Sequence, residues 1–331
     1  MHKKYIMFLL FLGLFLSCSK TPKIDLQRTN FHLQIPPSAT EEFFGRVKSI
    51  AIDDTGNFYI LDSEQVHVVK FDRNGVFVKE LISYGWGNGF VNRPSSIQVL
   101  DTTLILHNLS SLQFFSLDGT FRKSVEIGGR AAISVARDGT ILANRMSDRF
   151  QFGYCLETFD AHGKPLATFR SPRSQWFKNN AVDFAFAEFA RDGKIVYIPT
   201  LLDSAFLYDP SGRLLLAKKM EPVRPAKTTG VVFHVEDMFV AQNAIYLLRV
   251  NPDTSAEEVS CKRIDQYDFQ FNHLASFELP APVTIGIELE PWAPWYRKFI
   301  VRRNRFYLMV SQPIEHLVVY EPLSEKASAL K

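Results

Sequence analysis

Aromatic and arginine side chains gather in the segments that connect the predicted groups of strands. All four tryptophans of the chain fall in such segments, together with several arginines. Indole rings stack on sugars, peptides and protein surfaces, and guanidinium groups stack or donate hydrogen bonds to the same partners. The alternative is that these tryptophans plug gaps between groups of strands. We expect a binding surface formed by Trp86, Arg93, Arg145, Arg149, Trp176, Trp292, Trp295 and Arg297.

Motifs for catalysis and metal binding are missing from the chain. The eight histidines show no His-x-x-x-His spacing and the three cysteines no Cys-x-x-Cys pair, so no local zinc motif is present. Gly-x-Ser-x-Gly is also absent. The glycine-rich Gly85–Gly89 stretch lacks the Lys-Ser/Thr pair of a phosphate loop. We therefore predict no catalytic residue, metal ligand or cofactor, although His67, His107 and His316 could converge if the fold brought them together.

The N-terminus has the pattern of an export signal. Lys3 and Lys4 precede an apolar run from Ile6 to Leu16, which is too short to span a bilayer. Cys18 follows a small residue, and this arrangement resembles the bacterial lipobox, although Phe15 stands where leucine is favoured. The resemblance implies that residues 1–17 are a signal peptide and that Cys18 carries a lipid. The alternative is ordinary secretion with a cysteine near the cleavage site.

The predicted mature chain is close to neutral and faces an oxidising compartment. Removing two lysines with the signal peptide lowers the formal net charge from +3 to about +1, so nucleic acid is not an expected partner. By resemblance to lipoproteins of Gram-negative bacteria, serine after the lipidated cysteine implies an outer-membrane location, facing the periplasm or the cell surface. A bridge between Cys155 and Cys261 is permitted there, but the repeat pattern assigns them to different units, and two isolated thiols are expected.

The rest of the chain has the pattern of a repeated β-structure. Residues 47–81 contain four short strands separated by tight Asp/Asn/Gly turns. Turn glycines of the same kind, Gly75, Gly119, Gly163 and Gly212, are spaced 44, 44 and 49 residues apart, a period typical of propeller blades. Six such units can be counted, and the sixth has only three strands. The alternatives are a seven-bladed ring or a pair of β-sandwiches.

An N-terminal strand is expected to complete the sixth unit. Residues Phe31–Ile35 have alternating side chains and no partner within their own unit. Pairing them with the last strands would remove an exposed edge. The predicted organisation is therefore a tether over residues 18–29, an all-β, six-bladed propeller of four-stranded antiparallel blades over 30–323, and a C-terminal tail over 324–331.

The segment IAIDDTGNFYILDSEQVHVVKFDRNGVFV, followed by SYGWGNGFVNRPSSI, resembles the NHL-type six-bladed propellers, especially the lipoprotein propellers of Bacteroidetes-like bacteria. Because loops on a rigid scaffold are where binding groups concentrate, we expect a binding module that acts through its long loops, with an unknown protein, carbohydrate or peptide ligand. The alternative is a metal-dependent lactonase- or lyase-like propeller enzyme. For that activity Glu41, Glu42 and Asp53 are the only loose counterparts of the expected cation ligands.

Overall fold

The computed structural model describes an all-β protein. The described residues are 21–31, 33–34, 45, 47–108, 110–129, 131–147, 153–170, 185–200, 204–220, 235–250, 262–279, 296–311 and 315–322. They form twenty-four strands. Within these ranges there is no helix with the length and apolar character needed to cross a membrane.

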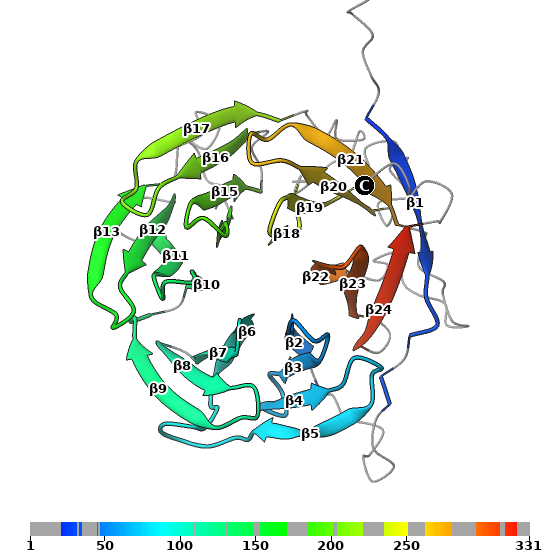
Figure 1. Ribbon diagram of the computed structural model, residues 1–331. Coiled ribbons are helices and arrows are strands. Elements are labelled where there is room, and N and C mark those ends of the chain that lie inside the picture. Colours follow the sequence, from blue (N-terminus) through cyan, green and yellow to red (C-terminus); the bar gives the residue numbers. More distant parts are fainter. Residues whose placement is uncertain are drawn as a thin grey trace, which may run out of the picture.

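The strands form sheets arranged around a common axis, which is the architecture of a β-propeller (Figure 1). The first sheet contains β2 (Val47–Ile52), β3 (Phe58–Asp62), β4 (His67–Phe71) and β5 (Phe77–Ile82). The second contains β6 (Pro94–Leu100), β7 (Thr103–Asn108), β8 (Ser111–Ser116) and β9 (Phe121–Glu126). The third contains β10 (Ala132–Val135), β11 (Ile141–Ser147), β12 (Gly153–Phe159) and β13 (Pro165–Arg170). The fourth contains β14 (Ala185–Phe189), β15 (Ile195–Pro199), β16 (Ser204–Tyr208) and β17 (Leu214–Lys219).

The fifth sheet has eight strands and includes both ends of the described chain. Its order is β18 (Asp237–Val240), β19 (Ile245–Val250), β20 (Lys262–Tyr267), β21 (His273–Glu278), β1 (Lys23–Arg28), β24 (Glu315–Pro322), β23 (Arg305–Ser311) and β22 (Tyr296–Arg302). β1 pairs in parallel with β21 and antiparallel with β24. The N-terminal strand β1 therefore joins the run β18–β21 to the run β22–β24.

The position of this joining strand corrects the sequence prediction. The residues that pair with β24 are Leu26, Gln27 and Arg28, opposite Pro322, Glu321 and Tyr320. They lie in the segment predicted to be a tether, whereas Phe31–Ile35 was predicted to form the strand. In the structure Gln34 makes only an isolated bridge to Val76. The physical reason lies in the side chains of β1: Ile24 and Leu26 are buried among Phe277 and Tyr320 in one apolar cluster.

The turns confirm the predicted repeat. All four predicted turn glycines have positive φ and lie between the third and fourth strands of their sheets. Gly212 also needs the missing side chain for space, because a Cβ there would come within 2.5 Å of the Phe169 ring on the preceding sheet. In the fifth sheet Phe271 takes the same place with φ of 56°. The Asp268 carboxylate supports that turn by accepting the Asn272 amide at 2.7 Å.

Candidate functional site

An axial cavity lies where the innermost strands face one another. Its volume is about 310 Å³, at the lower end of the range of small-molecule sites. Strands β2, β6, β10, β14, β18 and β22 all contribute to its wall. The lining residues include Ile, Val and Phe, but more of the surface that the cavity exposes is polar than apolar, and its charged groups come from β14, β18 and β22.

Polar side chains of the cavity wall connect each innermost strand to the next one around the ring. In five successive junctions a side-chain oxygen accepts a backbone N–H of the following strand. The pairs are Ser49 with Ile97 (3.2 Å), Gln98 with Val135 (3.1 Å), Ser134 with Phe189 (3.1 Å), Glu188 with Val240 (3.0 Å) and Asp237 with Phe299 (3.0 Å). These bonds satisfy the exposed edge of each innermost strand. These polar groups of the cavity wall therefore connect neighbouring sheets and stabilise the ring.

Three ionisable groups in the wall interact with one another. Lys298 Nζ lies 3.2 Å from Asp237 Oδ1, and Asp237 Oδ2 accepts the Phe299 amide. Burial raises the pKa of Asp237 against the opposing effect of Lys298, and the Asp237 charge raises the pKa of Lys298. Lys298 keeps 48% of its side-chain surface open, and this residue belongs to the wall of the axial cavity.

Glu188 is the group of this set that titrates near neutral pH. Burial raises its pKa to about 7, although the Val240 amide and Lys298 favour the charged form. A carboxyl group of this kind can give or accept a proton at neutral pH. None of these three residues belongs to a sequence motif, because they lie on separate strands. The one signal in the sequence is that these charged residues lie in predicted innermost strands, where apolar residues are expected.

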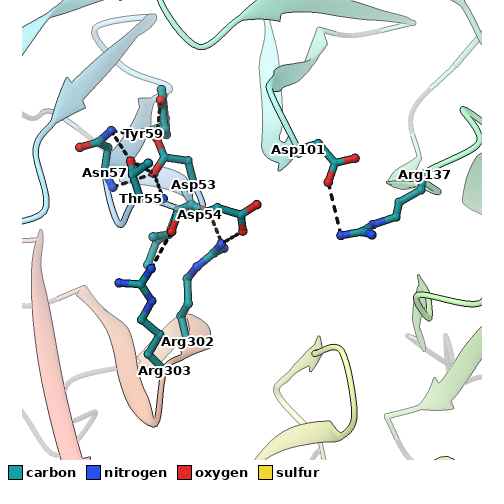
Figure 2. Close-up of polar contacts among 10 residues, drawn as sticks. Asp53, Asp54, Thr55, Asn57, Tyr59, Asp101, Arg137, Arg302 and Arg303 are labelled. Carbon is teal, nitrogen blue, oxygen red and sulfur yellow. Dashed lines mark hydrogen bonds and ion pairs between the residues drawn. The ribbon is translucent and has the colours of Figure 1, made fainter.

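The metal ligands considered for an enzyme do not come together in the described residues. Asp53 instead closes the β2–β3 turn: its carboxylate accepts from Thr55, Asn57 and Tyr59 (Figure 2). Burial alone would raise the pKa of Asp53, but these hydrogen bonds hold it below its ordinary value. Glu41 and Glu42 lie outside the described residues. In the described part of the chain no three His, Cys, Asp or Glu side chains form a group that could hold a metal ion.

Arginines bind the inner hairpin turns of neighbouring sheets to one another. Arg302 contacts the Asp54 carboxylate, and Arg303 donates to the Asp54 carbonyl at 2.8 Å. Arg137 lies 3.3 Å from Asp101. Figure 2 shows that the two contacts belong to separate places on the ring. Asp54 and Asp101 are therefore each paired with an arginine of a neighbouring sheet.

The loop between β5 and β6 carries an exposed aromatic cluster. Trp86 has 75% of its surface exposed, Tyr84 58% and Phe90 46%. Trp86 therefore does not plug a gap between sheets. A large exposed aromatic group costs solvation free energy unless a partner covers it.

This loop is held in one conformation by a buried glutamine. Gln113, 3% exposed, accepts the Gly89 amide at 2.9 Å and donates to the Phe90 carbonyl at 3.1 Å. Next to it, Asn108 accepts the Arg93 amide at 2.9 Å. The sequence analysis identified Trp86 and Arg93 but missed Gln113, which looks like an ordinary alternating residue of a strand.

The other predicted binding residues are distributed differently. Arg145 is only 15% exposed and contacts Glu157 at 2.7 Å and the Ile127 and Gly128 carbonyls, so it stabilises the sheet edge. Arg297 lies in β22, and its side chain is outside the described part. Outside the described residues lie Cys18, Arg149, Trp176, Trp292 and Trp295.

The histidines and cysteines form no common site in the described residues. His67 lies 3.6 Å from Glu80, and His107 Nδ1 lies 2.5 Å from the Ser95 hydroxyl; neither lines the axial cavity. The His316 side chain is not described. Cys155 is buried in β12 and Cys261 is outside the described residues, so the prediction of isolated thiols stays a prediction.

Comparison with known proteins shows the fold. No family model matches the chain, and no curated protein matches it. A Bacteroides fragilis protein described as exported has 10% identity and a TM-score of 0.58, covering 90% of this chain and 98% of that one. A Bacteroides vulgatus member of the DUF4221 family has 12% identity and a TM-score of 0.56, covering 89% and 97%. A streptogramin B lyase has 10% identity and a TM-score of 0.53, covering 90% and 97%. At these identities the likeness shows a β-propeller and nothing about activity.

Proposed function

We propose that this chain is a lipid-anchored propeller that acts as a binding module on the periplasmic side of the outer membrane or at the cell surface. Its ligand is a protein, carbohydrate or peptide. The resemblance of about residues 45–100 to NHL-type lipoprotein propellers and the likeness to exported Bacteroides propellers support an extracytoplasmic role. In this proposal Cys18 carries the lipid and residues 1–17 are removed.

The proposal takes the ring as six-bladed. The eight-stranded sheet divides at β1 into one run of four strands and one run of three. Each run begins at an innermost strand, β18 or β22, and both of these strands line the axial cavity. With four separate four-stranded sheets this makes six blades, and β1 supplies the outermost strand of the last one.

The observation that carries the binding role is the exposure of Trp86 on a rigid loop. Its loop connects two sheets on the face opposite the short hairpin turns. Because Gln113 already holds the loop, little conformational entropy is lost when a partner covers the ring. Exposed tryptophans at such positions are common hot spots, and losing one typically weakens binding by about 2 kcal/mol or more. That corresponds to about a 30-fold loss in affinity.

The test compares Trp86→Ala with Leu166→Ala, which alters an exposed apolar residue on β13. Partners are captured on the immobilised protein from envelope extract and, separately, on a glycan array. Trp86→Ala should leave the melting temperature nearly unchanged and reduce capture about 30-fold, while Leu166→Ala should change neither. A sharp fall in melting temperature with unchanged capture per folded molecule would mean that Trp86 has a packing role.

The lipid anchor is tested separately. A clickable fatty acid should label the wild-type chain and should not label Cys18→Ala, and this variant should leave the membrane fraction. A wild-type chain that stays unlabelled would remove the anchor from the proposal.

A second candidate function, a lactonase- or lyase-like activity in the axial cavity, rests on Glu188. Its carboxyl titrates near pH 7 close to a lysine in a cavity of about 310 Å³. Glu188→Gln should abolish such an activity and retain the fold. Turnover of lactone substrates that is equal in both forms would exclude a role for this residue.

A further inference from the structure

The described chain begins very close to the predicted anchor. β1 starts at Lys23, and the Ser276 amide donates to the Pro22 carbonyl at 3.0 Å. Only four peptide units separate Pro22 from Cys18, and four residues reach at most about 14 Å even when fully extended. If Cys18 is lipidated, as the proposed function requires, the part of the ring next to Pro22 stays within that distance of the lipid headgroups.

The outermost strand of the sheet next to Pro22, and the outermost strand of the sheet before it, expose leucines. Leu274 on β21 is 40% exposed, and on β17 Leu214 is 49% and Leu215 40% exposed. The two strands adjoin, because Lys218 at the end of β17 donates to Asn272 Oδ1 at 2.6 Å, in the turn that leads into β21. In Figure 1 β17, β21 and the beginning of β1 follow one another along one arc of the rim. We call these three segments the anchor arc.

Charged groups flank the leucines of the anchor arc, and two ion pairs lie among them. Arg213, with 76% of its side chain exposed, contacts Asp209 at 2.9 Å, and Lys23 contacts Glu278 at 3.3 Å. Long basic side chains can extend to headgroups while their stems stay on apolar surface. Lys218 donates to the neutral Asn272 side chain, so basic groups of the arc can add attraction to anionic lipid to the apolar contact and the short tether.

We propose that the anchor arc is a membrane-contact surface, on which the propeller lies with its rim against the bilayer that holds Cys18. The tether selects this arc among the exposed apolar positions of the rim. A short tether keeps the surface at a high effective concentration near the bilayer, so even weak contacts are occupied. Leucines that insert into the headgroup region gain apolar burial. The exposed Trp86 loop, after β5, then remains free for a partner.

The experiment measures which part of the rim touches lipid. The acylated full-length chain, with Cys155 and Cys261 replaced by alanine, is reconstituted in phosphatidylethanolamine–phosphatidylglycerol vesicles that contain a headgroup-nitroxide lipid. A fluorophore is attached at Leu274→Cys or, as the matched control, at Val78→Cys. Val78 is 47% exposed on β5, across the ring from β17 and β21 in Figure 1. Fluorophore quenching should be at least about three times stronger at position 274 than at position 78.

A second pair of variants tests the leucines. With the fluorophore at position 274, Leu214→Asp combined with Leu215→Asp should reduce quenching at least twofold, whereas Leu166→Asp on β13 should not change it. Equal quenching at positions 274 and 78, or no effect of the aspartates at 214 and 215, would overturn the contact surface. Acyl labelling of the same samples separates the two proposals: an unlabelled chain refutes the anchor, and a labelled chain with equal quenching refutes only the orientation.

Discussion

Replacing Glu188 with glutamine should stabilise the protein at alkaline pH and leave it unchanged at acid pH. Burial raises the folded-state pKa of Glu188 to about 7 from an ordinary 4.5. The folded state therefore binds this proton more tightly than the unfolded state does, and the free energy of unfolding falls as pH rises from about 4.5 to 7. A pKa difference of about 2.5 corresponds to about 3.4 kcal/mol. Because Glu188 is partly exposed to the cavity, solvent screening makes this free energy an upper limit.

Glutamine removes the charge of Glu188 but has nearly the same size and shape. Its side-chain oxygen can still accept the Val240 amide, which Glu188 accepts at 3.0 Å. Urea unfolding at pH 5 and pH 8 measures the effect, with Glu126→Gln, an exposed carboxylate on β9, as the control. The Glu188→Gln variant should gain about 1–3 kcal/mol over wild type at pH 8 and less than about 1 kcal/mol at pH 5. An equal difference at both pH values, or a loss at pH 8, would refute the assignment of a buried carboxyl that titrates near neutrality.

Three further predictions concern the scaffold. Leu26→Asp should lower the free energy of unfolding by about 3 kcal/mol or more, because Leu26 is 5% exposed in the core next to β1; Gln27→Asp, exposed on the same strand, should change urea unfolding little, and equal effects would contradict closure by β1. Gly212→Ala should destabilise the protein by at least about 1 kcal/mol more than Gly193→Ala, since both have positive φ but only Gly212 lacks room for a Cβ; matching melting temperatures would show that Phe169 moves aside easily. Gln113→Leu should cost about 1–3 kcal/mol by unpairing the Gly89 amide and should speed amide exchange in the Trp86 loop, and unchanged exchange there would mean that the loop is held by other contacts.

Local sequence patterns predicted most of the fold. A strand, a tight turn and the next strand are neighbours in the chain, so alternation and the glycines at 75, 119, 163 and 212 were sufficient to locate the repeat. The glycine-rich loop at 85–89 was likewise recognised as a connection and not as a phosphate site, and it connects β5 to β6. Closure of the ring was expected as well, because the last unit lacked a strand.

Which N-terminal segment closes the ring depends on contacts between residues far apart in the sequence, and local patterns do not show such contacts. Residues 23–28 and 31–35 both have a strand-like pattern, and only packing distinguishes them. β1 pairs with β21 and β24, which are about 250 and 300 residues away in sequence, and it buries Ile24 and Leu26 between the two runs. Phe31 and Leu33 instead pack against the first sheet.

The sequence by itself determined the repeat period, the turn chemistry and the concentration of tryptophans in connecting segments, because each is a property of residues close together in the chain. Tertiary structure alone decided which polar groups meet. Glu188 reaches Val240 across 52 residues and Asp237 reaches Lys298 across 61, and their pKa values are shifted only once the ring has formed around them. The tertiary structure also decides that Arg145 donates to neighbouring carbonyls while Trp86 stays exposed. The reason is physical: burial and charge proximity arise from the folded arrangement, which no short window of sequence contains.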